Sequence, residues 1–135
     1  METLESETDI PHGTETILLV DDDEVVRDLA ATVLDNFGYQ VITAGNGKET
    51  LDIYMRQRGK IALVILDLIM PEMDGRQCLN ELLRIDPKTK VIIASGHSVN
   101  GKVEEIFLSR AKAFVEKPYD IRNLLKNVRD VLDKD

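Results

Sequence analysis

The sequence is poor in the residue types that build disulfide scaffolds and membrane spans. Its 135 residues include one cysteine and no tryptophan. The single cysteine, Cys78, cannot form an internal disulfide, so a reducing cytoplasm is the expected compartment. No apolar run approaches the ~20 residues of a membrane span, and the acidic first residues do not resemble a signal peptide. We therefore expect a cytoplasmic protein that does not insert into a membrane.

Positive charge is also scarce. Asp and Glu number 25 against 17 Lys and Arg, which gives a formal net charge of -8. Because no basic surface is available to neutralise phosphates, the composition argues against direct nucleic-acid binding as the main role. The remaining composition, 43% hydrophobic and 31% charged residues, is typical of a globular protein, and the length suits one domain.

Apolar strand-like segments alternate with segments of helical periodicity after residue 14. Residues 1–14 show no periodicity, so we expect a flexible lead-in or linker there and a domain at residues 15–133. The predicted strands are 16–20, 40–44, 61–66, 90–94 and 113–116. The predicted helices have apolar residues spaced within 26–37, 51–55, 79–83, 103–107 and 121–132. This alternation predicts an α/β fold with a parallel sheet covered by helices on both faces.

Local signals mark several of the helices. Asn46 and Glu49, three residues apart, are typical of a capping box, and we expect Met55 on the buried face of the helix that follows. Asp120 is placed to cap the last helix, in which Ile121 is predicted to face inward.

Polar residues recur where predicted strands end. Asp21 and Asp22 follow the first strand, Asp67 the third, Ser95 the fourth and Lys117 the fifth. Because parallel strands share one carboxyl edge, these side chains are expected to converge on one cleft. Clustered carboxylates need a cation or raised pKa values. Oxygen ligands without nearby His or Cys favour a hard ion, and the sequence therefore predicts a Mg²⁺ site.

The same residues predict phosphoryl transfer. Pro71 and the turn signal at Asp74–Gly75 mean that Asp67 opens onto a loop, where it can act as a nucleophile and form an aspartyl phosphate. Lys117 and Mg²⁺ would neutralise the transferred oxygens, and Ser95 would donate a hydrogen bond to one of them. Each residue alone has a structural explanation, but their coincidence at four strand ends favours a functional site.

Over residues 15–133 the sequence resembles a receiver domain of the two-component response regulators. The likeness rests on four motifs: Asp21–Asp22, the run from Asp67 through Met70–Pro71 to Asp74–Gly75, Ser95–Gly96 and Lys117–Pro118. It implies a flavodoxin-like, doubly wound sheet of five strands in the order 2-1-3-4-5, with five helices. It also implies a signalling receiver, not an enzyme, which takes a phosphoryl group from a sensor histidine kinase or a histidine phosphotransfer protein.

The resemblance also implies a role for each site residue. Asp67 would be the phospho-acceptor and Lys117 would contact the phosphoryl group. The metal ligands would be Asp22, Asp67 and the backbone carbonyl of Ile69, with Asp21 acting mainly through metal-bound water. The acidic residue Asp23 leaves a one-residue ambiguity in the metal-binding pair. We choose Asp21 and Asp22 because they come directly after the strand, and assign Asp23 or Glu24 to the helix start.

Ser95 and Phe114 would form the switch. In the family, the hydroxyl moves toward the phosphoryl group and the aromatic ring rotates inward, which here would remodel the surface of the helix near 103–107, the strand 113–116 and the last helix. The bond before Pro118 is commonly cis in the family. Two departures matter: Phe114 lacks the phenol hydroxyl more often found there, and Ile69 has no polar group to orient a water, which predicts slow self-dephosphorylation.

Two alternatives stay open at this point. Asp21 and Asp23 after an apolar strand also resemble the haloacid-dehalogenase phosphatases, with Asp21 as the nucleophile and Asp23 as the acid, although the run at 67–75 would then be unexplained. Within the receiver interpretation, the chain is either a free-standing regulator or the C-terminal receiver of a hybrid sensor histidine kinase, which the entry at 13–20 slightly favours.

Overall fold

A five-stranded parallel sheet forms the centre of the molecule. The structure, a computed structural model, describes residues 10–70, 72–96 and 110–134. The strands lie in the order β2-β1-β3-β4-β5, which confirms the predicted order. Their bounds are Thr16–Val20 (β1), Gln40–Ala44 (β2), Ile61–Asp67 (β3), Val91–Ser95 (β4) and Ala113–Glu116 (β5).

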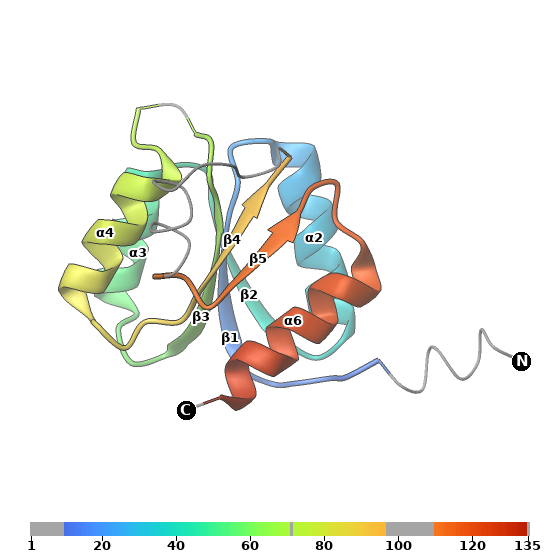
Figure 1. Ribbon diagram of the computed structural model, residues 1–135. Coiled ribbons are helices and arrows are strands. Elements are labelled where there is room, and N and C mark those ends of the chain that lie inside the picture. The colour runs from blue at the N-terminus through green and yellow to red at the C-terminus, as the bar shows by residue number, and fades with distance from the viewer. Residues whose placement is uncertain (1–9, 71, 97–109, 135) are drawn as a thin grey trace, which may run out of the picture.

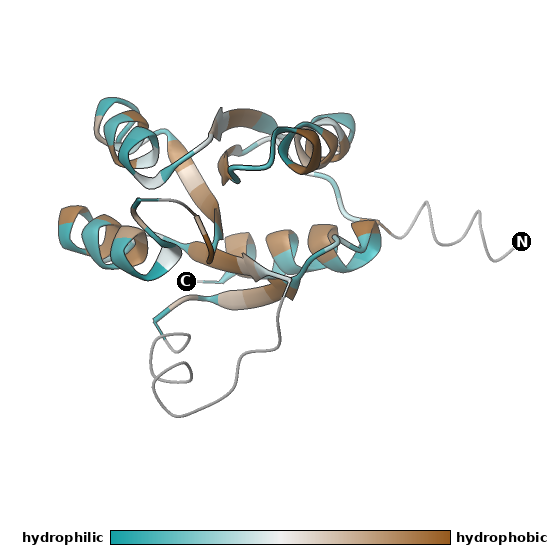
Figure 2. Ribbon diagram, turned by 90° about the horizontal axis from the view of Figure 1, so that it is seen from above, coloured by the Kyte–Doolittle hydropathy of each residue, from teal (hydrophilic) through white to brown (hydrophobic). Residues whose placement is uncertain are grey.

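Helices cover both faces of this sheet. Four helices lie within the described ranges: α2 (Glu24–Asn36), α3 (Gly47–Arg56), α4 (Gly75–Ile85) and α6 (Ile121–Asp133). Figures 1 and 2 show α2 and α6 on one face and α3 and α4 on the other. The predicted helix around 103–107 lies outside the described residues. None of the helices that the structure describes is long and apolar enough to cross a bilayer.

The core is divided into two layers by the sheet. In β1, Ile17 and Leu19 pack into the cluster under α2 and α6, whereas Leu18 and Val20 pack into the cluster under α3 and α4. All four side chains are fully buried. This explains why the strand is apolar at successive positions: side chains alternate between two faces, and both are covered. The brown strands in Figure 2 show the result.

Polar side chains begin the helices as predicted. The carboxylate of Asp120 accepts a hydrogen bond from the Asn123 backbone at 3.0 Å, so Asp120 caps α6. The Asn46 side chain accepts one from the Glu49 backbone at 2.8 Å. The Glu49 carboxylate returns to the backbone N–H of Gly45, not to that of Asn46. The predicted capping box is therefore present with its second half displaced by one residue.

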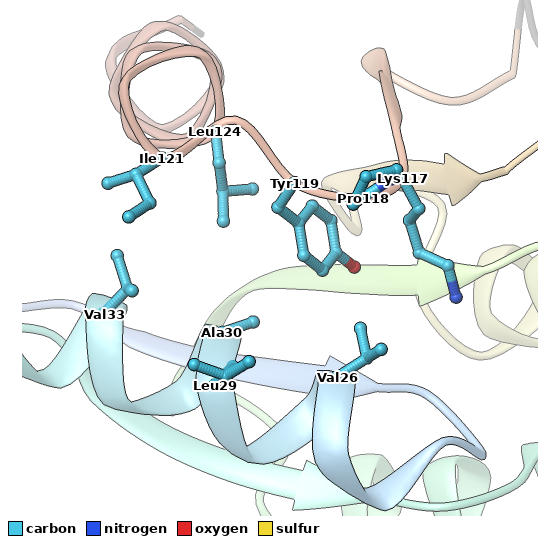
Figure 3. A pocket seen from close by; sticks show the side chains of 9 residues that line it. All are labelled: Val26, Leu29, Ala30, Val33, Lys117, Pro118, Tyr119, Ile121 and Leu124. Atoms are coloured by element: carbon cyan, nitrogen blue, oxygen red, sulfur yellow. The ribbon is translucent and has the colours of Figure 1, made fainter.

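Three apolar side chains are more exposed than their periodicity suggests. The prediction of inward-facing positions was wrong for Met55 and Ile121, which are 57% and 49% exposed, and Leu29 of α2 is 64% exposed. Periodicity marks the apolar stripe of a helix, but not which edge of that stripe reaches the sheet. Leu29 and Ile121 instead border an apolar cavity of about 480 Å³ between α2 and α6 (Figure 3).

The segment before β1 contacts the domain. Ile10 is partly buried against the cluster under α2 and α6. The backbone N–H of Gly13 donates a hydrogen bond to the Phe37 carbonyl at 3.1 Å. The start of the domain at residue 15 stays a prediction, and these contacts involve residues as far as five positions before it.

An arginine of α6 ties this segment to the end of the chain. The Arg129 guanidinium contacts both carboxylate oxygens of Glu15, at 3.2 and 2.6 Å, and lies 2.8 Å from Asp133. It also donates a hydrogen bond to the His12 carbonyl at 3.2 Å. Hydrogen bonding to Arg129 lowers the pKa of Glu15 to about 2. We call Glu15, Arg129 and Asp133 the amino-edge cluster, because they lie where the strands begin.

Candidate functional site

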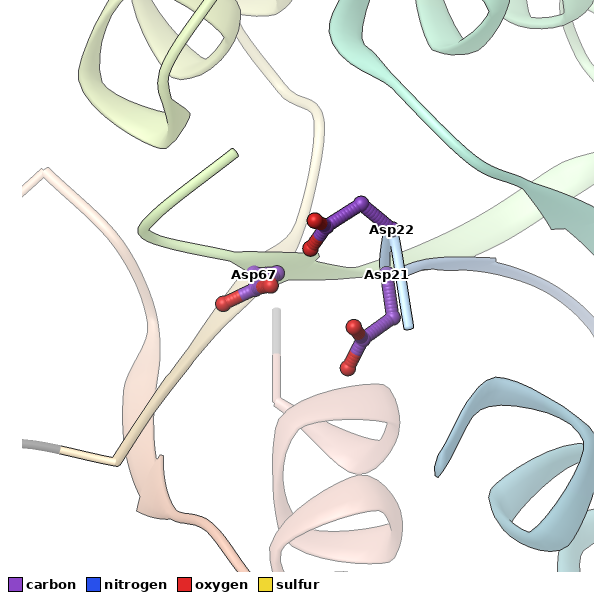
Figure 4. Close-up of side chains that lie close together, drawn as sticks. All are labelled: Asp21, Asp22 and Asp67. Carbon is purple, nitrogen blue, oxygen red and sulfur yellow. The ribbon is translucent and has the colours of Figure 1, made fainter. Parts of the chain in front are cut away.

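Three carboxylates meet at the opposite edge, where the strands end. Asp21 comes directly after β1, Asp22 follows it, and Asp67 is the last residue of β3. They meet because β1 and β3 pair in parallel, with Val20 opposite Leu66. One oxygen of each carboxylate lies within 4.8 Å of the others, and Figure 4 shows the three side chains gathered around one space. We call them the acidic cluster.

Lys117 supplies the cation of this site. Its ammonium lies 2.8 Å from Asp21 Oδ2 and 3.3 Å from Asp67 Oδ2, although Lys117 and Asp21 are 96 residues apart in the chain. The residue follows β5, and its backbone N–H donates to the Ser95 carbonyl at 2.8 Å. The bond between Lys117 and Pro118 is cis. The structure thus brings the predicted ammonium to the predicted carboxylates.

Burial sets the protonation behaviour of the site. It raises the pKa of the Asp67 carboxyl to about 6, against the influence of Lys117, and the charge of Asp21 raises this pKa as well. Burial by itself would lower the pKa of the Lys117 ammonium, but the hydrogen bond to Asp21 and the charge of Asp67 raise it. Two buried carboxylates therefore share one ammonium, and Asp67 is the one whose ionised form is held less strongly than usual.

Asp21 is held on all sides. Its Oδ1 accepts a hydrogen bond from the Asp23 backbone at 2.9 Å, and its Oδ2 accepts one from Lys117. Its own backbone N–H donates to Ala44, and its carbonyl accepts from the Arg27 guanidinium at 3.2 Å. The sequence analysis missed Arg27, because an arginine six residues after an aspartate has no distinctive spacing. Both Asp21 oxygens are thus engaged within the protein, whereas Asp22 is exposed.

Asp23 lies outside the acidic cluster. Its side chain accepts hydrogen bonds from the backbones of Val25 and Val26, at 3.0 and 3.2 Å, and so caps α2. This confirms that Asp23 serves the helix start, and it assigns the side chain of Asp22, not Asp23, to the cluster. A negative charge is favoured at this position, because the first backbone N–H groups of a helix have no partner within the helix.

The loop after Asp67 is packed closely against α4. The backbone N–H of Gly75 donates to the Leu68 carbonyl at 2.8 Å. A Cβ atom at Gly75 would lie 2.6 Å from the Asp67 carbonyl oxygen, so only glycine permits this approach. The backbone N–H of Ile69 lies 3.4 Å from Asp67 Oδ1, while the Ile69 side chain is 59% exposed. The loop thus carries an exposed apolar side chain two residues after Asp67.

The two predicted switch residues lie on the adjoining strands. Ser95 ends β4, is 1% exposed, and follows Ala94, which lies opposite Asp67 in the sheet register. Phe114 of β5 is partly buried against the cluster under α3 and α4. The sheet thereby brings Ser95 to the edge that carries the acidic cluster. The residues that follow Gly96, 97–109, lie outside the described residues.

The donor set fits a hard divalent cation. Within the described residues, the acidic cluster is the one group of three or more Asp, Glu, His or Cys side chains close enough to hold a metal ion. All of its donors are carboxylate oxygens, which Mg²⁺ and similar ions prefer. A cation here would also relieve the repulsion between the buried carboxylates.

Comparison with known proteins decides the family. A model of the response regulator receiver domain matches residues 17–129. The chain is a response regulator receiver domain. It is a phospho-accepting module of two-component signalling, and receiver domains of this kind interact with histidine kinases and phosphotransfer proteins. The alternative of a haloacid-dehalogenase phosphatase is thereby wrong, and Asp23, its supposed acid, is occupied in capping α2.

The share of a relative's length that this chain matches differs widely between relatives. The receiver domain is 34% identical over 131 residues to the sensor kinase CckA of Brucella abortus, matching 97% of this chain but only 14% of that kinase. It is 31% identical to the chemotaxis protein CheY of Thermotoga maritima, covering 85% of this chain and 95% of CheY. Among solved structures, the CheX–CheY–BeF3–Mg²⁺ complex of Borrelia burgdorferi is similar, with a TM-score of 0.82 and 31% identity over 95% of this chain and 94% of that one.

Proposed function

We propose that Asp67 is the residue of this receiver domain that accepts the phosphoryl group. The observation that carries the proposal is the position of its carboxylate, which ends β3 beside the Lys117 ammonium and the other two carboxylates of the acidic cluster. A raised pKa leaves Asp67 partly protonated near pH 6, so a bound cation is needed to make it a good nucleophile there.

The neighbouring residues have distinct tasks. Asp22 and Asp67, with the backbone carbonyl of Ile69, would hold Mg²⁺ directly, and Asp21 would act mainly through metal-bound water. When bound, Mg²⁺ neutralises negative charge on the transferred oxygens. Lys117 binds one of these oxygens, which its contact with Asp67 already allows. Ser95 donates its hydroxyl to another.

The surface that phosphorylation remodels comprises the helix predicted near 103–107, which lies outside the described residues, together with β5 and α6. Phosphorylation adds about two negative charges at Asp67. Ser95 moves toward them, and Phe114, the next strand's switch residue, turns inward in response. This is a population shift between two packings of the same core. Phe114 lies against the cluster under α3 and α4, so its rotation changes the packing on that side of β5.

The phosphoryl donor is a phosphohistidine on a sensor histidine kinase or a histidine phosphotransfer protein in the cytoplasm. The match to CckA supports a receiver that is part of a hybrid kinase, and the match to nearly the whole of CheY supports a free-standing regulator. The two contexts share one chemistry at residue 67. We expect the folded unit to comprise residues 15–133 in either case.

The test is to identify the phosphorylated residue directly. The protein is incubated with Mg²⁺ and acetyl phosphate, and the acyl phosphate is located by borohydride reduction and mass spectrometry. We expect the modification at Asp67, and its loss in Asp67→Asn or when the metal is chelated. An Asp52→Asn variant, which changes an exposed carboxylate paired with Arg56, serves as the matched control. A modification at any other residue would contradict the proposal.

A further inference from the structure

Tyr119 carries a buried hydroxyl that the phosphoryl-transfer roles above leave unused. Its oxygen is inaccessible to solvent and makes no hydrogen bond to the part of the chain that the structure describes. A buried hydroxyl without a partner costs stability, and a phenylalanine of the same shape would avoid this cost. A tyrosine at this place therefore suggests a partner that is gained in another state of the protein.

The hydroxyl lies at the end of the apolar cavity nearest the site. The cavity is lined by Leu29 and Ala30 of α2 and by Ile121 and Leu124 of α6. In Figure 3 the Tyr119 ring crosses it, and the hydroxyl points away from Ile121 and Leu124, to the side on which Lys117 lies. The apolar walls offer the hydroxyl nothing to bond with, and the side to which it points is that of Lys117, whose ammonium contacts Asp21 and Asp67.

The field of the acidic cluster acts on this phenol. Burial raises the pKa of Tyr119, and the negative charges of Asp21 and Asp67 raise it further. The hydroxyl therefore keeps its proton at all ordinary pH values and is available as a donor. Asp21 and Asp67 are carboxylates that accept such a bond.

Phosphorylation of Asp67 would change the supply of hydrogen-bond donors to the Asp21 carboxylate. In the structure one Lys117 ammonium serves Asp21 at 2.8 Å and Asp67 at 3.3 Å. A phosphoryl group on Asp67 attracts that ammonium, because it adds about two negative charges and strong acceptor oxygens. The Asp21 carboxylate, which is fully buried, then loses a share of its donor, and a buried carboxylate short of donors is costly.

We propose that Tyr119 is a positioning residue of the loaded site: its hydroxyl donates a hydrogen bond to the Asp21 carboxylate when Lys117 turns to the phosphoryl group. This inference rests on the proposed phosphorylation of Asp67. The hydroxyl is unbonded in the free protein, and it keeps the Asp21 carboxylate in place after Lys117 has moved. Tyr119 does not touch the phosphoryl group.

The experiment compares Tyr119→Phe with the wild type in two states. Thermal unfolding measures the free protein, and calorimetry measures the binding of beryllofluoride, a phosphoryl analogue, in the presence of Mg²⁺. We expect the midpoint of unfolding of the free variant to be unchanged or higher, and its affinity for beryllofluoride to fall about tenfold, since a hydrogen bond to a charged group is lost only in the loaded state. A merely structural role would not lower the affinity for beryllofluoride while leaving the midpoint of unfolding unchanged or raising it.

Tyr54→Phe is the matched control. The Tyr54 hydroxyl is buried at the other end of the molecule and is already bonded, to Thr89 at 2.8 Å and to Asp86 at 3.2 Å. Its removal should lower the midpoint of unfolding and leave beryllofluoride binding unchanged. In an Asp21→Ala background, Tyr119→Phe should have no further effect on affinity, because its partner is absent.

Three results would overturn the inference. They are wild-type affinity in Tyr119→Phe, an equal loss of affinity in Tyr54→Phe, and an undiminished effect of Tyr119→Phe in the Asp21→Ala background. If the wild type itself bound no beryllofluoride with Mg²⁺, the proposed function would fail, and this inference with it. Failure of the Tyr119 result alone leaves Asp67 as the phospho-acceptor.

Discussion

The two edges of the sheet both pair carboxylates with a cation, yet with opposite effects on the carboxyl group. At the amino edge, hydrogen bonding to Arg129 lowers the pKa of Glu15 to about 2. At the carboxyl edge, burial raises the pKa of Asp67 to about 6 despite the nearby Lys117. The difference shows that the pKa of a carboxyl group in an ion pair does not follow from the charge of its partner alone.

Burial and geometry account for the contrast. The Glu15 side chain is 31% exposed and meets both nitrogens of a planar guanidinium, so its ionised form is well solvated and well bonded. The Asp67 side chain is 5% exposed and lies 3.3 Å from an ammonium that is closer to Asp21. The amino edge is thus built for cohesion, whereas the carboxyl edge holds a carboxylate that gains from a further cation.

The largest difference between the two edges is expected when the cation of each edge is removed in turn. Lys117→Met should slow phosphorylation by acetyl phosphate about 10²–10³-fold, because the charge that binds a transferred oxygen is lost. Arg129→Met, at the amino edge, should leave the rate unchanged. Rapid mixing and quantification of phosphorylated protein give both rates. An unimpaired Lys117→Met variant would remove Lys117 from the reaction.

Neutralising the two carboxylates should change stability in opposite directions. In Mg²⁺-free buffer at pH 7, Asp67→Asn should raise the free energy of unfolding by about 2 kcal/mol, since a buried carboxylate whose ionisation is disfavoured is removed. Glu15→Gln should lower it by about 1 kcal/mol or less. Urea unfolding of both variants measures these changes, and a shared sign would contradict the contrast between the edges.

The pH dependence gives a second check on the same variants. The folded protein holds the Asp67 proton more tightly than the unfolded chain does, so the advantage of Asp67→Asn should shrink as the pH falls from about 6 to 3.8. Glu15 behaves in the opposite way: its contribution is present above pH 4.5 and is lost as the pH falls toward about 2. Unfolding curves across this range separate the two windows.

A smaller effect is expected at the loop that covers the carboxyl edge. Ile69→Asn should speed hydrolysis of the aspartyl phosphate about tenfold, because an amide can orient an attacking water where the exposed isoleucine cannot. Met55→Asn is the matched control, since Met55 is exposed to nearly the same extent, 57% against 59%, but lies on α3. The decay of phosphorylated protein after donor removal is the measurement. An unchanged lifetime in Ile69→Asn would show that another feature limits hydrolysis.

Much of the carboxyl edge could be predicted, because it depends on short patterns of neighbouring residues in the sequence. Apolar strands followed directly by polar residues can be recognised in the sequence. Parallel pairing of the strands then places Asp21, Asp67 and Lys117 at one edge, whatever the packing of the other side chains. The caps at Asp23 and Asp120 depend on three or four successive residues, so they were predictable for the same reason.

What escaped prediction depends on distant packing. The pairing of Glu15 with Arg129 joins residues 114 apart that no spacing rule connects. The exposure of Leu29 and Ile121 depends on how far α2 and α6 stand apart, which periodicity does not record. The unbonded state of the Tyr119 hydroxyl is a property of the three-dimensional surroundings alone.

The hold of Arg129 on both Glu15 and the end of α6 has a practical consequence. The segment before β1 and the last turn of α6 both lie at the end of the sheet where the strands begin, although they run to opposite sides in Figure 1. A tether, an affinity tag or a fused protein joined at either end would therefore hang from the far side of the domain. Such a protein could be immobilised on a surface by either end, with the edge of the sheet that carries the acidic cluster still facing the solution.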